Sequence, residues 1–264
     1  MSVWAEFNPL KSCVIGTLPN AEDILPHTKL TNRYAKYFSE IVYRARVELD
    51  NLEKTLQGFG VRTHRSEQCY EIFNGKTVST PPLAIRDIFS VYGDNLFKGN
   101  FAFTWNKDVP ASCDHLLETL DWNKTYSLPH NNIFYDGDFA KFDPETCLDR
   151  PLFHPSIALR VGNDIVVSDK HGKEGNRSGR TAYLQWIKSI NENAKIHFVD
   201  TSSHIDAQIF LVRPGLLLTS LNSNRLPAFF DKWEKIHVEP VQKQLQHKKN
   251  EYRHKKFHRC FFQM

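Results

Sequence analysis

Residues 156–168 read SIALRVGNDIVVS, two β-rich runs on either side of the dipeptide Gly162-Asn163. Glycine and asparagine favour a tight turn, and β-branched side chains favour strands, so this stretch predicts a β-hairpin. Two further stretches also place a turn that contains glycine between two β-rich runs. They are DIFSVYGDNLF at 87–97, with Gly93-Asp94, and AQIFLVRPGLLLTS at 207–220, with Pro214-Gly215. The sequence therefore predicts three similar hairpins.

Helical patterns lie between these hairpins. Residues 179–200, GRTAYLQWIKSINENAKIHFVD, have apolar side chains at helical spacing and then a β-rich run, which predicts a helix followed by a strand. Residues 32–60 predict a longer helix that ends at Gly58 or Gly60, with a strand from Val61. A repeated unit of hairpin, helix and strand favours an α/β fold of similar modules. Without a Pro- or Ser-rich linker, we expect one domain over residues 1–264.

The composition describes a folded protein: 41% of the 264 residues are apolar, 12% are aromatic and 24% are charged. No apolar run is long enough to cross a membrane, and the N-terminus does not resemble a secretion signal, so we expect the cytoplasm. The five cysteines are scattered without a CxxC pair, which argues against a disulfide framework and a zinc site. We expect no metal and no organic cofactor.

The formal net charge is +4, and basic residues are concentrated in the segment 243–259. Such a run can contact the phosphate groups of a nucleic acid, but it is more often the solvated face of a helix or a loop. Nucleic acid is therefore not the partner that we favour.

Two short stretches contain candidate catalytic groups. TSSHIDAQIF at 201–210 has His204 and Asp206 two residues apart before a β-rich run, a spacing that places both side chains on one side of a strand. An imidazole beside a carboxylate can move protons at neutral pH, although a surface histidine and a turn aspartate would look the same. In FYDGDFAKFD, Asp136 and Asp138 flank a glycine, which suits either a cation-binding or histidine-orienting loop or a tight turn.

Four stretches, in this order, resemble motifs of the amidinotransferases, the guanidino-modifying enzymes that include arginine:glycine amidinotransferase. They are EFNPLKSCVIG at 6–16, IRDIFSVYGDNLF at 85–97, FYDGDF at 134–139 and SHIDAQIFLVRPGLLLTS at 203–220. The resemblance implies the pentein fold, an α/β propeller of five ββαβ modules.

In that family a cysteine thiolate attacks the guanidinium carbon of arginine, ornithine leaves, and an acceptor amine such as glycine takes the amidino group. Carboxylates hold the planar cation and a histidine moves the protons. By position, the resemblance implies these roles: His204 as acid and base, Asp136 as its orienting acid, Asp87 and Asp206 as guanidinium ligands, and Arg225 as the ligand of a substrate carboxylate. If Asp138 and Phe139 are aligned with the family's motif without a gap, Tyr135 instead takes the position of the orienting acid.

The glycine-rich His-Cys segment near the C-terminus of these enzymes has no counterpart here. Cys260, the one cysteine after His204, is a possible nucleophile, and a packing role is the alternative. We expect the last module to be incomplete and the chain to be cut short. Two further hypotheses remain: a guanidino hydrolase that uses water as acceptor, and a catalytically inactive guanidino-binding or interaction protein. A homodimer is one alternative for the oligomeric state.

Overall fold

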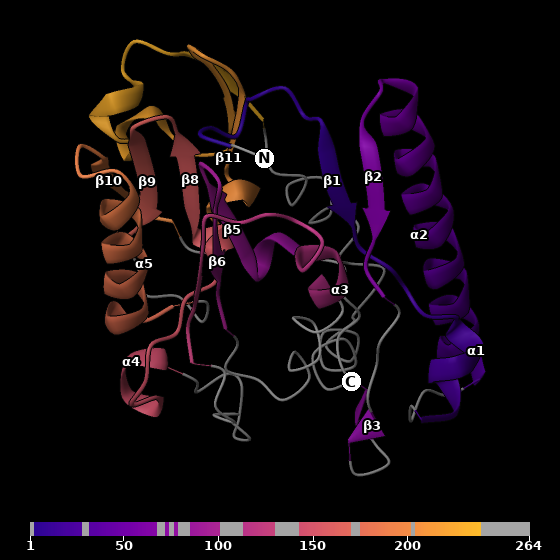
Figure 1. Ribbon diagram of the computed structural model, residues 1–264. Helices are drawn as coiled ribbons and strands as arrows, with labels where there is room; N and C mark the ends of the chain where they lie inside the picture. The colour runs from indigo at the N-terminus through magenta and orange to yellow at the C-terminus, as the bar shows by residue number, and fades with distance from the viewer. Residues whose placement is uncertain are drawn as a thin grey trace. The chain divides into compact units, whose positions relative to one another are not determined.

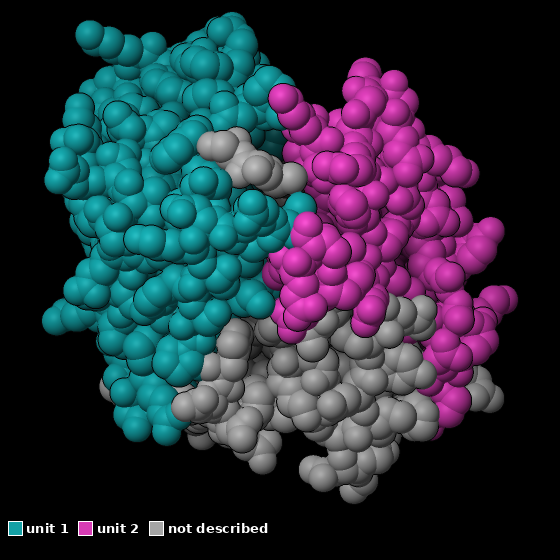
Figure 2. Space-filling model, viewed as in Figure 1, with its two compact units in different colours: residues 1–9, 86–103, 120–240 teal, residues 10–85, 104–119, 241–264 magenta. Residues whose placement is uncertain are grey.

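The computed structural model describes residues 3–27, 32–67, 72–73, 77–78, 85–100, 113–129, 143–169, 175–201 and 204–238. The chain divides into two compact units (Figure 2), of which unit 1 comprises residues 1–9, 86–103 and 120–240 and unit 2 comprises residues 10–85, 104–119 and 241–264. The single domain over residues 1–264 stays a prediction. No helix among these described ranges is both long enough and apolar enough to span a bilayer.

Unit 1 contains three sheets of three strands with the same topology (Figure 1). The first two strands of each sheet form an antiparallel hairpin, and the third lies parallel to the second. The sheets are β5 (Phe89–Tyr92), β6 (Asn95–Lys98) and β7 (Lys124–Ser127); β8 (Ala158–Val161), β9 (Asp164–Ser168) and β10 (Lys195–Val199); and β11 (Ile209–Arg213), β12 (Leu216–Thr219) and β13 (Glu234–His237). The three predicted hairpins and the predicted α/β repeat are confirmed.

Each hairpin turns at a glycine in the left-handed region of backbone space. The φ angles are 62° at Gly93, 68° at Gly162 and 80° at Gly215. A residue with a Cβ atom is strained in this region, and glycine is not. The glycines therefore set where each hairpin reverses.

The helix α5 (Arg177–Ile190) follows β9 and leads into β10, as the sequence predicts. Its buried side presents Tyr183, Trp186 and Ile187 to a core that includes Phe97 and Phe153. The Tyr183 ring stacks on Phe153 at 4.3 Å and meets Phe97 edge-on at 5.0 Å between centroids. Each fully buried aromatic ring contributes about 2 kcal/mol or more to folding, so this helix holds the first two sheets of unit 1 together.

A second core lies on the other face of the β8–β10 sheet. It joins that sheet to the third one, and the connection between β12 and β13 contributes to it through the short turns η8 (Ser223–Arg225) and η9 (Ala228–Phe230). Phe230 on η9 is fully buried there, and His197 on β10 stacks on Phe229 at 4.9 Å. The third module thus uses short turns where the second uses a helix.

Unit 2 contains a strand, a helix and a parallel strand, which is the second half of the same module. β1 (Ser12–Ile15) pairs in parallel with β2 (Arg62–Arg65), and α2 (Asn32–Gly58) connects them. The predicted long helix is confirmed, but its inward side includes Val42, whereas Ile41 is exposed. The remaining short elements are α1 (Ala21–Ile24), η1 (Leu25–His27), β3 (Ile72–Phe73), β4 (Thr77–Val78) and α3 (Asp114–Leu117) in unit 2, and α4 (Pro144–Cys147) in unit 1.

A short 3-10 turn precedes each hairpin of unit 1. These turns are η2 (Ile85–Asp87), η6 (Pro155–Ile157) and η7 (Ile205–Ala207). Each turn carries a polar side chain: Asp87 on the first, Ser156 on the second and Asp206 on the third. η6 and η7 lie in contact, so the modules bring these polar groups towards one another.

Substitution of Gly179 by alanine should destabilise unit 1. A Cβ atom at Gly179 would lie 2.0 Å from the carbonyl oxygen of Leu152, which is backbone and cannot move away easily. In an open helix the same change would be stabilising by about 1 kcal/mol, but here we expect a loss of at least about 2 kcal/mol.

Urea denaturation followed by circular dichroism measures this loss. Gln185→Ala, at an exposed position of the same helix, is the control and should unfold at the midpoint of the unsubstituted protein. A Gly179→Ala protein with an unchanged midpoint would contradict the packing described here.

Candidate active site

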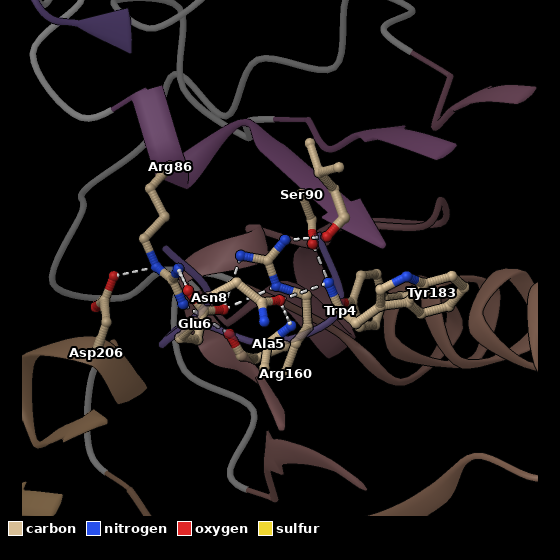
Figure 3. Close-up of polar contacts among 11 residues, drawn as sticks. Trp4, Ala5, Glu6, Asn8, Arg86, Ser90, Arg160, Tyr183 and Asp206 are labelled. Carbon is tan, nitrogen blue, oxygen red and sulfur yellow. Dashed lines mark hydrogen bonds and ion pairs between the residues drawn. The ribbon is translucent and has the colours of Figure 1, made fainter. Parts of the chain in front are cut away.

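The partly buried carboxylate of Glu6, in the N-terminal segment, lies between two guanidinium groups (Figure 3). Oε2 of Glu6 accepts a hydrogen bond from Arg86 at 2.9 Å, and Oε1 accepts one from Arg160 at 2.8 Å. Burial alone would raise the pKa of Glu6, but Arg160 and Arg86 outweigh it and lower the pKa to about 2. Glu6 is therefore ionised throughout the physiological range.

Arg86 connects this carboxylate to Asp206 on η7. Nε of Arg86 lies 2.6 Å from Oδ2 of Asp206, and a terminal nitrogen donates to the carbonyl oxygen of Ala158 at 2.9 Å. Burial opposes the charge of Arg86, but Glu6 and Asp206 together raise its pKa above the ordinary value. The guanidinium is thus a fixed cation that places Asp206, as Figure 3 shows.

The predicted histidine lies beside a predicted guanidinium ligand. Nδ1 of His204 is 3.5 Å from Oδ1 of Asp87, and both side chains are partly exposed. Burial raises the pKa of Asp87 and Asp206 raises it further, whereas His204, the hydroxyl group of Ser156 and Arg86 lower it. The pKa of Asp87 is raised overall, so its ionised form is one that an added cation would stabilise.

A second imidazole lies next to this pair. The rings of His154 and His204 have centroids 6.4 Å apart and planes at 74°. His154 is buried, and burial, together with the neighbouring His204, lowers its pKa to about 3. His154 is therefore neutral at physiological pH.

Arg225 is the last residue of η8 and contacts Asp200, the residue that follows β10. A terminal nitrogen of Arg225 donates to the carbonyl oxygen of Asp200 at 2.5 Å and lies 3.8 Å from the carboxylate of the same residue. The described polar contacts of Arg225 are therefore with Asp200 and not with Asp87 or Asp206. Asp136, Asp138 and Cys260 lie outside the described residues.

The cysteines of the described ranges do not have the features of an activated nucleophile. Burial and the charge of Glu53 raise the pKa of Cys13, which disfavours the thiolate. Cys113 is fully buried, and Cys147 is exposed on α4. No group of three or more histidine, cysteine, aspartate or glutamate side chains in the described ranges is arranged to hold a metal ion.

Glu6, His154, Ser156 and Arg160 were not among the residues singled out from the sequence, and Arg86 carried no assigned role. For His154, the position in the repeat is informative, because His154 and His204 are the N-cap residues of the turns before the second and third hairpins. Aligning the first two hairpins by their turn glycines would have drawn attention to Ser156, which like Asp87 lies six residues before its glycine. The partnership of Glu6 with Arg160 spans 154 positions and left no local pattern.

No family model matches the chain. Inosamine-phosphate amidinotransferase 1 from Streptomyces griseus is 24% identical over 284 aligned residues, covering 89% of this chain and 75% of that protein. Its solved structure superimposes with a TM-score of 0.68 at 20% identity, covering 90% of this chain and 75% of that one. The chain is thus similar to an amidinotransferase in both sequence and fold.

Two other solved structures share the fold. An amidinotransferase from Microseira wollei in the saxitoxin biosynthetic pathway gives a TM-score of 0.67 at 19% identity, covering 92% of this chain and 77% of that one. DDAH from Pseudomonas aeruginosa, in complex with citrulline, gives 0.60 at 9% identity, covering 88% and 77%. The amidinotransferase-like chain therefore has the pentein-like α/β fold that its sequence predicts, and the resemblance to the family is confirmed.

The acid stability of the protein should depend on Glu6. Its pKa falls from 4.5 to about 2 on folding, so its ionised form stabilises the folded state at pH values above 4.5. This contribution, of the order of 3 kcal/mol, is lost as the pH falls from 4.5 towards 2. Glu6→Gln should therefore be less stable at neutral pH and lose less stability on acidification.

Urea unfolding at a series of pH values between about 6 and 2 measures the difference. Glu234→Gln, which removes an exposed carboxylate paired with Arg213 at 3.9 Å, should follow the unsubstituted protein. Identical pH dependences for Glu6→Gln and the unsubstituted protein would show that Glu6 does not carry this stabilisation.

Proposed function

We propose that this chain binds the guanidinium group of arginine at Asp87 and Asp206 and transfers its amidino group to an acceptor amine. The observation that carries the proposal is the group formed by His204, Asp87, Asp206 and Arg86, with 3.5 Å between the first two and 2.6 Å between the last two. These side chains come from turns of different modules in a relative of the amidinotransferases. We keep the cytoplasm as the expected compartment.

The charges of this group favour a monovalent cation as ligand. Glu6, Asp87 and Asp206 are three carboxylates, and Arg86 and Arg160 are two guanidinium groups. With His204 neutral, one negative charge is left for a ligand to neutralise. A guanidinium group is always protonated, and its planar set of donors suits bidentate contact with a carboxylate.

His204 would move the protons in both halves of the transfer. It first takes the thiol proton of the cysteine, for which Cys260 is the candidate; the thiolate attacks the guanidinium carbon, and ornithine leaves when its nitrogen receives that proton from His204. The acceptor amine, for example glycine, then loses a proton to His204 as it attacks the amidino carbon, and the thiolate is released. Asp136 would orient His204, and Arg225 would bind a substrate carboxylate.

Product analysis distinguishes transfer from its alternatives. Arginine labelled in the guanidino carbon is incubated with the protein in the presence and absence of glycine. Label in an amidinated acceptor supports transfer, whereas label in citrulline or urea without an acceptor indicates a hydrolase of the same fold. Binding of arginine without any product indicates a guanidino-binding protein.

Arginine binding should weaken as the pH falls. The loss should begin at a higher pH than it would if the carboxylate that holds the guanidinium had the pKa of an ordinary aspartate. The pKa of Asp87 is raised from 3.8 by burial, so Asp87 takes up a proton earlier on acidification and loses the charge that holds the cation. Asp87→Asn should weaken binding at neutral pH by about tenfold or more, because a charged hydrogen-bonding partner is lost.

Isothermal titration calorimetry with arginine at several pH values tests both statements. Asp164→Asn is the matched control, because Asp164 is similarly buried and lies 2.7 Å from His197. It should bind arginine as the unsubstituted protein does. Equal affinities in Asp87→Asn and the control would remove Asp87 from the site.

A further inference from the structure

The two neighbouring histidines occupy equivalent places in successive modules. His154 is the N-cap residue of η6, before the second hairpin, and His204 is the N-cap residue of η7, before the third. Their edge-on arrangement, with centroids 6.4 Å apart, is within the range of favourable aromatic contacts. The repeat of the fold therefore brings a second imidazole against the first.

His154 can contribute packing but not proton transfer. Its exposed fraction is 6%, and both ring nitrogens are buried. Because its pKa is lowered to about 3, His154 stays neutral at physiological pH, and it acts on His204 through the edge-on packing of an uncharged ring. A neutral neighbour can hold a ring in place without adding a second positive charge beside a bound cation.

The same short segment also contacts the partner of His204. The hydroxyl group of Ser156, two residues after His154, is buried beside Asp87 and acts to lower the pKa of that carboxyl group. Both members of the His204–Asp87 pair thus lie next to one segment of three residues. Any shift of that segment would displace the histidine and the carboxylate together.

Two buried asparagines hold the chain immediately before this segment. Oδ1 of Asn100 accepts from the Phe153 amide at 3.1 Å, and Oδ1 of Asn176 accepts from the Leu152 amide at 2.9 Å. Gly99 also packs closely against this chain, because a Cβ atom at position 99 would lie 2.4 Å from the carbonyl oxygen of Phe153. These contacts fix the segment that carries His154.

We propose that His154 and Ser156 are positioning residues of this site: Ser156 fixes Asp87 through its hydroxyl group, and His154 fixes the ring of His204 through edge-on packing. The proposal deepens the proposed function and rests on the role given there to His204 and Asp87. Among the described residues, Asp87 from η2 and His154 beside η6 face His204.

Nuclear magnetic resonance of the histidine rings tests the packing role without a ligand or turnover. In the unsubstituted protein at neutral pH, His204 should give one set of Cε1–Hε1 signals. His154→Ala removes the packing partner, so the His204 signals should split or broaden as the ring samples other orientations. His154→Phe keeps a neutral aromatic ring and should restore a single set.

The matched control for the aromatic substitution is His197→Phe, which changes a partly buried histidine that contacts Asp164 and Phe229. It should leave the His204 signals unchanged. Unchanged His204 signals in folded His154→Ala, or the same splitting in His154→Phe, would overturn the packing role of His154.

Ser156→Ala tests the other half of the proposal and covers the case in which His154→Ala does not fold. Loss of the hydroxyl group beside Asp87 should allow Asp87 to move and should weaken arginine binding about tenfold, with thermal unfolding close to that of Ser90→Ala. Ser90→Ala makes the same change at a buried hydroxyl 3.3 Å from Tyr183 and should bind arginine normally.

The two proposals can fail separately. If the unsubstituted protein does not bind arginine but the His204 signals respond as described, the positioning role stands and the proposed function falls. If arginine binds normally and equally to Ser156→Ala and Ser90→Ala, the function stands and the positioning role of Ser156 is wrong.

Discussion

The carboxylate of Glu6, held between Arg86 and Arg160, is the interaction on which the arrangement of unit 1 depends. Backbone bridges from Val3 to Gly93 and from Ala5 to Val161 attach the same N-terminal segment to the first and second hairpins. The ion pairs then join that segment to η2 and β8. Because one buried partner without the others would be an uncompensated charge, the segment, the turn and the strand must assemble together.

The chemistry of the site follows from this network. Arg86, fixed by Glu6, holds Asp206 on the third module, while Asp87, the next residue in the chain, meets His204. The contact between Arg86 and Asp206 is itself a guanidinium–carboxylate contact, the type of interaction proposed for the substrate. A site built in this way keeps Asp206 placed and leaves Asp87, whose charge is destabilised by burial, as the carboxylate that gains most from a bound cation.

The sequence predicted the features that are local in the chain. Glycine turns and β-rich runs identified the three hairpins, and helical spacing identified α2 and α5, because these signals lie within a few residues of one another. The spacing of His204 and Asp206 predicted that both side chains lie on one side of a strand, but they lie at the 3-10 turn η7. There Asp206 pairs with Arg86 and His204 with Asp87, residues more than a hundred positions away. Such contacts depend on how modules pack, so the roles of Glu6, His154 and Arg160 could not be predicted from local pattern.

A crystal structure of the protein with arginine bound would test the central claim most directly. The account predicts that the ligand guanidinium lies between Asp87 and Asp206, with His204 in contact with the nitrogen that links the guanidinium to the side chain, and with Arg86 still paired to Glu6. Arginine bound away from Asp87 and His204, or a crystal grown with saturating arginine in which these carboxylates contact no ligand, would contradict it.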